Sequence, residues 1–286
     1  MSTWRALFVS AALVVAGCGD DDAVPTDAGT AVDAAPGDAG RPGPCTVDSS
    51  TAVQVTGVVA NLATMCAPSF AMDYQVCWLD HSDHCTMVNS LGQYMLPGLP
   101  NAEIVLRMDK AGEIPRLLSL APLGCSYNAQ IFASPTRPYF DALAGGTGYD
   151  ATKAYVVTYV QSGRDPGAPI PSACVGLPGF QMTASIPGAT IQYMDATGTS
   201  LAAGTETTAS GIALITVDMA PMLGSTPDTV VITGTRSDTT VACHLNDGHG
   251  WTRGDSTSQT VFVQEAPLLA GHITYGWWVS CPLPTP

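Results

Sequence analysis

The stretch NSLGQYMLPGLPNAEIVLRM, residues 89–108, decides the fold. The even positions of Ile104–Met108 are apolar and share one face of an extended strand, whereas Arg107 points to the other face. Earlier in the stretch, Gly92 can supply a backbone turn that other residues resist, and a strand-like run follows it. The stretch therefore predicts two short strands joined by turns, each with one buried face.

The same kind of segment recurs along most of the chain. Short runs of Val, Ile, Thr and Tyr are bounded by Gly, Pro, Asp or Asn, which is typical of a β-sandwich or barrel, and no segment has a helical period. The chain is therefore expected to be all-β. The ten best strand candidates are Val53–Val59, Tyr74–Leu79, Gln93–Leu96, Ile104–Met108, Ala154–Val160, Thr190–Met194, Ile212–Val217, Thr229–Thr235, Thr257–Val263 and Ile273–Val279.

A weak internal repeat divides this β-rich region. Residues 74–96 read as a strand, a polar turn and then Ser-Leu-Gly leading into another strand, and residues 187–215 repeat the order with Ser210-Gly211. The first copy, with its Leu99-Pro100 turn, resembles the transthyretin-like, carboxypeptidase-regulatory-like domain. That resemblance implies small β-sandwiches of Ig-like or transthyretin-like form, which usually support, space or bind, and it transfers no catalytic residues.

The N-terminus has the order of an export signal. Arg5 precedes the apolar run Ala6–Val15, and Val15-Ala16-Gly17-Cys18 places two small residues before a cysteine. A run of this length is too short for a membrane span, which needs about 20 residues. The motif resembles the lipobox of bacterial lipoproteins, which implies cleavage before Cys18 and attachment of fatty acids such as palmitate. A plain secretory signal is the alternative.

An acidic tether is expected next. It lacks aromatic residues and is rich in Ala, Gly and Pro, so it should be disordered, and its like charges should extend it. The six aspartates of this tether are Asp20, Asp21, Asp22, Asp27, Asp33 and Asp38. The predicted organisation is a signal peptide at 1–17, a lipidated cysteine with its tether at 18–44, and two β-sandwich domains at 45–150 and 151–286.

The net charge of −14 excludes several partners. Nucleic acid is not expected to bind, because phosphate binding needs clustered Lys and Arg, and Lys110 and Lys153 are the only lysines. A charge-driven contact with anionic lipids is excluded for the same reason. Membrane attachment is therefore expected through the lipid alone. Gly19 stands where the lipoprotein family's inner-membrane retention signal has Asp, which favours the outer membrane.

The cysteine count of an exported chain points to disulfides. With Cys18 used for lipid, eight remain, and about 105 connectivities are open to them. In a hairpin symmetric about His81, Cys77 would lie opposite Cys85. A disulfide between Cys174 and Cys243 could link parts of the second domain. The disulfide candidates are Cys45, Cys66, Cys77, Cys85, Cys125, Cys174, Cys243 and Cys281.

Most catalytic signatures are missing from the sequence. It contains no H-E-x-x-H, G-x-S-x-G, P-loop or G-x-G-x-x-G motif, and no C-x₂-C pair for a metal. No catalytic residue, cofactor or metal site is therefore predicted, and the chain is not expected to be an enzyme. An exported hydrolase with a scattered active site is the alternative, because catalytic groups can be far apart in sequence.

Five side chains are candidates for a ligand surface. The segment 80–85 places two histidines and two carboxylates at a hairpin tip, which could meet a transition metal but lacks a clear further ligand. The aromatic candidates could bind a sugar ring or a partner protein, or simply cover a loop or fill an interdomain contact. The candidates are His81, His84, His249, Trp251 and Trp278.

The function expected from these features is that of a lipoprotein anchored in the bacterial cell envelope. Its non-catalytic β-sandwich modules would bind a protein or carbohydrate ligand, or act as structural spacers.

Overall fold

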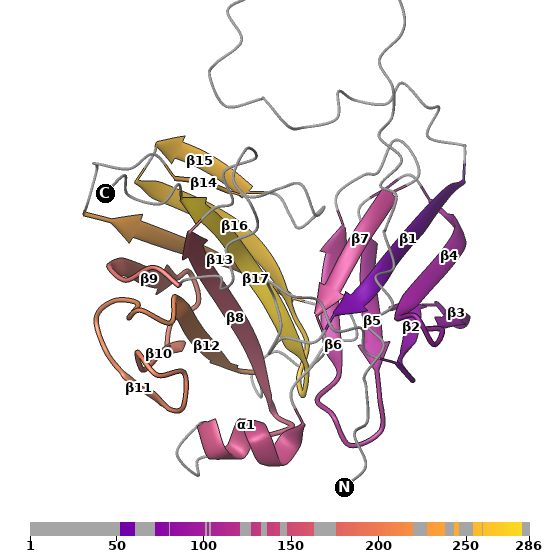
Figure 1. Cartoon of the computed structure of the whole chain (residues 1–286), viewed down its shortest axis with the longest axis horizontal. Helices are drawn as coiled ribbons and strands as arrows, with labels where there is room; N and C mark the ends of the chain where they lie inside the picture. Colours follow the sequence, from indigo (N-terminus) through magenta and orange to yellow (C-terminus); the bar gives the residue numbers. More distant parts are fainter. Residues whose placement is uncertain are drawn as a thin grey trace, which may run out of the picture. The chain divides into compact units, whose positions relative to one another are not determined.

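A computed structural model shows an all-β protein, as predicted, with a single short helix, α1 (Arg137–Leu143), among the residues it describes. Its strands form three sheets (Figure 1). The described residues are 52–60, 72–79, 81–100, 102, 104–120, 127–132, 136–143, 148–162, 176–219, 228–237, 243–245, 254–258 and 260–281.

The smallest sheet has three strands in the order β4-β1-β7. β1 (Val53–Ala60) lies between β4 (Gln93–Leu99), to which it is antiparallel, and β7 (Tyr127–Phe132), to which it is parallel. The turn before β4 is the one predicted at Gly92, whose φ is 73° and whose N–H donates to the Asn89 carbonyl.

The largest sheet has the order β11-β10-β12-β8-β17-β6-β5-β2-β3, with β14 also paired to β17. Its strands come from both halves of the sequence. Their bounds are β2 (Gln75–Trp78), β3 (His81–Met87), β5 (Ile104–Asp109), β6 (Arg116–Leu120), β8 (Lys153–Ser162), β10 (Thr190–Met194), β11 (Leu201–Ala203), β12 (Ile212–Asp218), β14 (His244–Leu245) and β17 (Ile273–Cys281).

The third sheet has four antiparallel strands in the order β15-β16-β13-β9. Their bounds are β9 (Phe180–Ala184), β13 (Asp228–Arg236), β15 (Gly254–Ser258) and β16 (Val261–Leu268). The sequence-based strand Thr257–Val263 is wrong in one respect, because it spans the end of β15 and the start of β16, which pair antiparallel. The other nine predicted strands overlap observed ones.

The two smaller sheets pack on opposite faces of the large sheet. One hydrophobic cluster joins Val55 of β1 to Leu106 of β5, and it includes Tyr155 of β8. A second cluster joins Phe262 of β16 to Val156 of β8. Because successive residues of a strand point to opposite faces, the neighbouring positions in β8 place these clusters on either side of the sheet.

The large sheet continues through the position where two separate sandwiches were expected to divide, near residue 150. β17 is parallel to β8 along most of its length, and its first residues pair with β6, with Ile273 opposite Arg116 and Thr274 opposite Leu117. The hydrophobic clusters follow the predicted boundary only in part, because the first one also takes residues from β8, β12 and β17. The two halves of the sequence therefore share one sheet.

Candidate functional site

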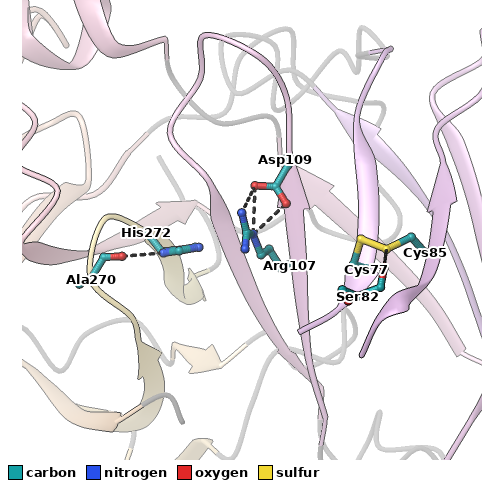
Figure 2. Close-up of polar contacts among 7 residues, drawn as sticks. All are labelled: Cys77, Ser82, Cys85, Arg107, Asp109, Ala270 and His272. Carbon is teal, nitrogen blue, oxygen red and sulfur yellow. Dashed lines mark hydrogen bonds and ion pairs between the residues drawn. A yellow bond between two sulfur atoms is a disulfide. The ribbon is translucent and has the colours of Figure 1, made fainter. Parts of the chain in front are cut away.

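The β2–β3 hairpin carries the disulfide that the sequence predicted. Cys77 and Cys85 are directly opposite, with Cα atoms 4.1 Å apart, and their sulfur atoms are bonded (Figure 2). The expected symmetry about His81 is wrong, because His81 itself pairs with Trp78 across the hairpin. The extra residues between His81 and Cys85 form a bulge, and the carbonyl oxygen of Ser82 in this bulge lies 3.2 Å from Cys85 Sγ.

Both histidines of the hairpin contact the Trp78 ring, but they differ in exposure. The His81 ring is exposed, and its centroid lies 3.5 Å from that of Trp78. The His84 ring is half-buried and meets Trp78 edge-on, at 6.0 Å. His84 Nε2 lies 2.6 Å from the carbonyl oxygen of Pro97, which can only accept, so this nitrogen carries a proton. Of the two histidines of this hairpin, His81 is the more exposed, although its ring lies against Trp78.

The described residues of the hairpin tip do not form a recognisable metal site. In the part of the chain that the structure describes, no three His, Cys, Asp or Glu side chains are grouped so as to hold an ion. Cys77 and Cys85 are bonded to each other, so neither sulfur is available as a thiolate ligand.

An open groove lies beside the base of this hairpin, and the sequence analysis did not predict it. Its volume is about 540 Å³. Strands from two different sheets form its walls, and its lining residues carry hydroxyl, amide and thioether groups but no charge. The lining residues are Thr56, Gly57, Val58, Thr86, Met87, Asn89, Gln93, Tyr94 and Met95.

Strand alternation explains how β4 contributes to the groove. Tyr94 and Leu96 point into the core, so Gln93 and Met95 point outward, and Met95 is 54% exposed. A methionine at an outward position of a strand is the sequence signal that could have indicated an exposed apolar surface here. The neighbouring strand that completes the groove could not be read from the local sequence.

A charged pair lies on the face of β5 that points away from the first hydrophobic cluster. Arg107 donates from Nε and Nη2 to Asp109 Oδ1, at 3.0 and 2.9 Å (Figure 2). Arg107 pairs with Cys77 of β2 in the sheet. Its side chain lies on the opposite face from Ile104, Leu106 and Met108, as the alternation predicted. The two side chains are 41% and 30% exposed, so water screens the pair and its contribution to stability is small.

His272, in the turn before β17, is shown in the same view (Figure 2). Its Nδ1 donates to the Ala270 carbonyl at 2.8 Å, and its Nε2 is buried with no hydrogen-bond partner among the described residues. Burial lowers the pKa of His272 below its usual value, and the hydrogen bond to Ala270 opposes this. The Arg107 charge lowers the pKa further, and the charge of its partner Asp109 raises it. Burial therefore favours the neutral form of this imidazole.

A polar cluster is buried inside the first hydrophobic cluster. The Arg116 guanidinium is fully buried and lies 3.9 Å from the centroid of the Tyr275 ring. Burial lowers the pKa of Arg116 to about 9 and raises that of Tyr275 to about 12. The Tyr74 hydroxyl donates to the Glu113 carboxylate, and burial raises the Tyr74 pKa.

The second disulfide corrects one sequence-based idea. Cys243 is bonded to Cys281, so a pairing of Cys243 with Cys174 is wrong. The register explains the choice, because His244 is opposite Ser280 in the sheet and this places Cys243 beside Cys281. Arg236 Nη1 also donates to Cys243 Sγ, at 3.1 Å.

Several predicted residues cannot be placed. Trp278 lies in β17 opposite Tyr159, but its side chain is outside the described part of the structure. The predictions that fall outside the described residues concern the signal peptide, the tether, Cys18, Cys45, Cys66, Cys125, Cys174, His249 and Trp251.

Comparisons with known proteins do not assign the chain to a family. No family model matches the sequence, and the search of curated proteins found no match. Among solved structures, the minor pilin GBS52 of Streptococcus agalactiae is 13% identical, with a TM-score of 0.25 over 82% of this chain and 98% of that one. The shaft pilin SpaA of Lactobacillus rhamnosus GG is 11% identical, with a TM-score of 0.22 over 82% of this chain and 100% of that one.

A chain of a type II cohesin-X-dockerin complex from Acetivibrio cellulolyticus is 12% identical, with a TM-score of 0.24 over 34% of this chain. The match spans 64% of the length of that chain. Likeness at this level carries no argument about function.

Among the residues that the structure describes, no helix has the length and apolar character needed to span a bilayer.

Proposed function

We propose that this protein is an envelope lipoprotein that acts by binding and not by catalysis. The observation that carries the proposal is the uncharged groove beside the disulfide-linked β2–β3 hairpin. The proposed ligand-binding surface is this groove.

The scaffold around the groove is suited to binding because it is held in place before a ligand arrives. The Cys77–Cys85 bond fixes the two strands of the hairpin, and the His84–Pro97 contact fixes the hairpin to β4 of the other sheet. A surface that is already ordered loses less conformational entropy on binding than a mobile one. The backbone that carries side chains such as Gln93 is therefore already in position when a ligand binds.

The lining of the groove indicates the chemistry of the ligand. Thr56, Thr86, Asn89 and Gln93 offer hydroxyl and amide groups, while the flexible thioethers of the methionines adapt to irregular apolar shapes. None of the lining side chains carries a charge that would select an ionic ligand. An uncharged stretch of a partner protein or a neutral carbohydrate fits this lining.

The alternative function, an exported hydrolase, finds no support in the groove. A hydrolase of the usual type needs a nucleophile next to a base, and the base is most often His, Asp or Glu. The groove offers the hydroxyls of Thr56 and Thr86, but its described lining contains none of those bases.

The anchor part of the proposal rests on the sequence. The motif ending at Cys18 would fix the chain to the envelope, where the outer membrane is our proposed location, and the aspartate-rich segment that follows would act as a spacer. Display at a surface is useful to a protein that works by binding.

Photo-cross-linking on intact envelopes tests the binding role. A photoreactive residue replaces Gln93, whose side chain is exposed in the groove, and a matched control carries the same residue at the exposed Ala203 in β11. The proposal expects a discrete cross-linked species from position 93 that position 203 does not form. Identical patterns from both positions would contradict it. So would turnover of an ester, glycoside or peptide by the purified chain that is lost when one histidine is replaced.

A further inference from the structure

The described methionines fall into two sharply different groups. Met87, Met95 and Met72 are 60%, 54% and 46% exposed, although methionine is usually a core residue. Every other methionine in the described part of the chain is buried. These buried residues are Met108, Met182, Met194 and Met219.

Two of the exposed methionines share one location. Met87 ends β3 of the ten-stranded sheet, Met95 lies in β4 of the three-stranded sheet, and both line the groove. Most of the other groove-lining side chains are polar, so the two thioethers supply much of its exposed apolar surface. Met72 precedes β2 and is not part of the lining.

We propose that Met87 and Met95 are modification sites, oxidised to methionine sulfoxide by a peroxide or a hypohalous acid. Each sulfur loses two electrons and gains one oxygen atom. A peroxide is reduced to water or an alcohol in this step, and hypochlorous acid is reduced to chloride with release of a proton. Two thiols of a sulfoxide reductase can reverse the change, forming a disulfide and water.

The modification changes the groove and leaves the fold in place. A sulfoxide is polar and accepts hydrogen bonds, so oxidation replaces the apolar part of the lining with a hydrated surface. Neither side chain is in the core, so the oxygen atoms need no space inside the sandwich. Oxidation of Met108, which is 2% exposed, would instead place a polar group among buried aliphatic side chains. This inference needs no ligand and is independent of the proposed binding role.

Limited oxidation of the full chain with hydrogen peroxide, followed by peptide mapping, tests the site. Met87 and Met95 should each gain about 16 Da, at least about tenfold faster than Met108, Met182 and Met219. The circular dichroism spectrum should stay unchanged during the fast phase. Equal rates at groove and buried positions, or slower reaction in the groove, would overturn the proposal.

A variant pair isolates the effect on the groove. In a Met72→Leu background, oxidation should shorten retention on a hydrophobic column. The triple variant Met72→Leu, Met87→Leu, Met95→Leu should show no comparable change under the same treatment. If the triple variant shifts as much as the background protein, the altered surface lies elsewhere and the inference is wrong.

Discussion

His84 Nε2 and the Pro97 carbonyl oxygen are 2.6 Å apart, and this hydrogen bond joins an edge strand of the ten-stranded sheet to an edge strand of the three-stranded sheet. Gly98, which follows Pro97, has a φ of 72°, a left-handed backbone conformation that residues with a Cβ rarely adopt. His84 therefore links two layers of the fold, whereas the sequence suggested only a candidate ligand-surface residue at a hairpin tip.

Replacing His84 with Ala should lower the free energy of unfolding by about 1 kcal/mol, the usual net value of one hydrogen bond. Urea denaturation followed by circular dichroism measures the change. Asp83→Ala, at the exposed neighbouring position of the same bulge, is the control and should stay within about 0.5 kcal/mol of the wild type. Equal effects of the two variants would show that the link to Pro97 is not stabilising.

The two disulfides should differ in their contribution to stability. They close loops with sequence separations of 8 for Cys77–Cys85 and 38 for Cys243–Cys281. Loop-closure entropy predicts losses of about 2.5 and about 4 kcal/mol when each pair is replaced by alanine. Denaturant unfolding of the two double variants compares them, and a larger loss for the shorter loop would contradict the prediction.

In the wild type, a thiol assay in denaturant should detect no free thiol in the mature chain.

Gly211 and Gly188 form a matched pair for substitution by alanine. Both have positive φ, at 69° and 83°, which strains any residue with a Cβ by about 1 kcal/mol. At Gly211 a Cβ would also lie 1.9 Å from the Val160 carbonyl oxygen, whereas at Gly188 no atom lies within 4 Å. Gly211→Ala should therefore be destabilising by about 2 kcal/mol more than Gly188→Ala in thermal or urea unfolding. Similar losses would be inconsistent with the tight turn before β12.

Stability should fall in mild acid because of His272. Its folded-state pKa is lowered from 6.5, so the unfolded chain takes up this proton at a higher pH than the folded protein does. The stability that its neutral form contributes is complete above pH 6.5 and is lost as the pH falls from 6.5 through the folded-state pKa. Unfolding measured between about pH 8 and 5 should show this decline.

Two variants separate the causes of the His272 shift. His272→Gln should flatten the decline, because the glutamine side chain does not titrate. Arg107→Gln should make the decline shallower without abolishing it, because burial is the larger cause of the lowered pKa. A wild-type curve that is level across this range would contradict the prediction.

Lipidation of Cys18 is tested by growth with a labelled fatty acid. The wild type should carry the label, and Cys18→Ser should not, because an oxygen replaces the sulfur that would form the thioether. Fractionation of the envelope then tells which membrane holds the labelled protein. Equal labelling of the two proteins would exclude this cysteine as the anchor.

Much of the fold could be predicted from strand alternation, because one buried and one exposed face leave a period of two in the sequence. Ile104–Met108 shows that period, and it became β5 with the expected faces. The turn between β15 and β16 escaped detection because Ser258 and Thr260 border it, without a glycine or proline at either position. Helix α1 has only seven residues, too few to reveal a helical period.

The candidate site was less predictable because it depends on neighbours that are far apart in sequence. His81 and His84 were identified, but the partner of His84 belongs to another sheet. The groove needs β1, β3 and β4 together. Arg116 reads as a surface residue, and only the assembled interior shows that the Tyr275 ring covers it.

The position of β17 governs the order in which the chain can fold. Residues 273–281 come after every other described strand in sequence, yet they lie between β8 and β6. Until this segment has left the ribosome, β6 and β8 expose backbone donors and acceptors on their inner edges, which other chains can pair with. Native pairing across this gap joins residues far apart in sequence and should be slow. A slow final step of this kind keeps a nascent polypeptide unfolded for longer, the state in which it can pass through a narrow translocation channel.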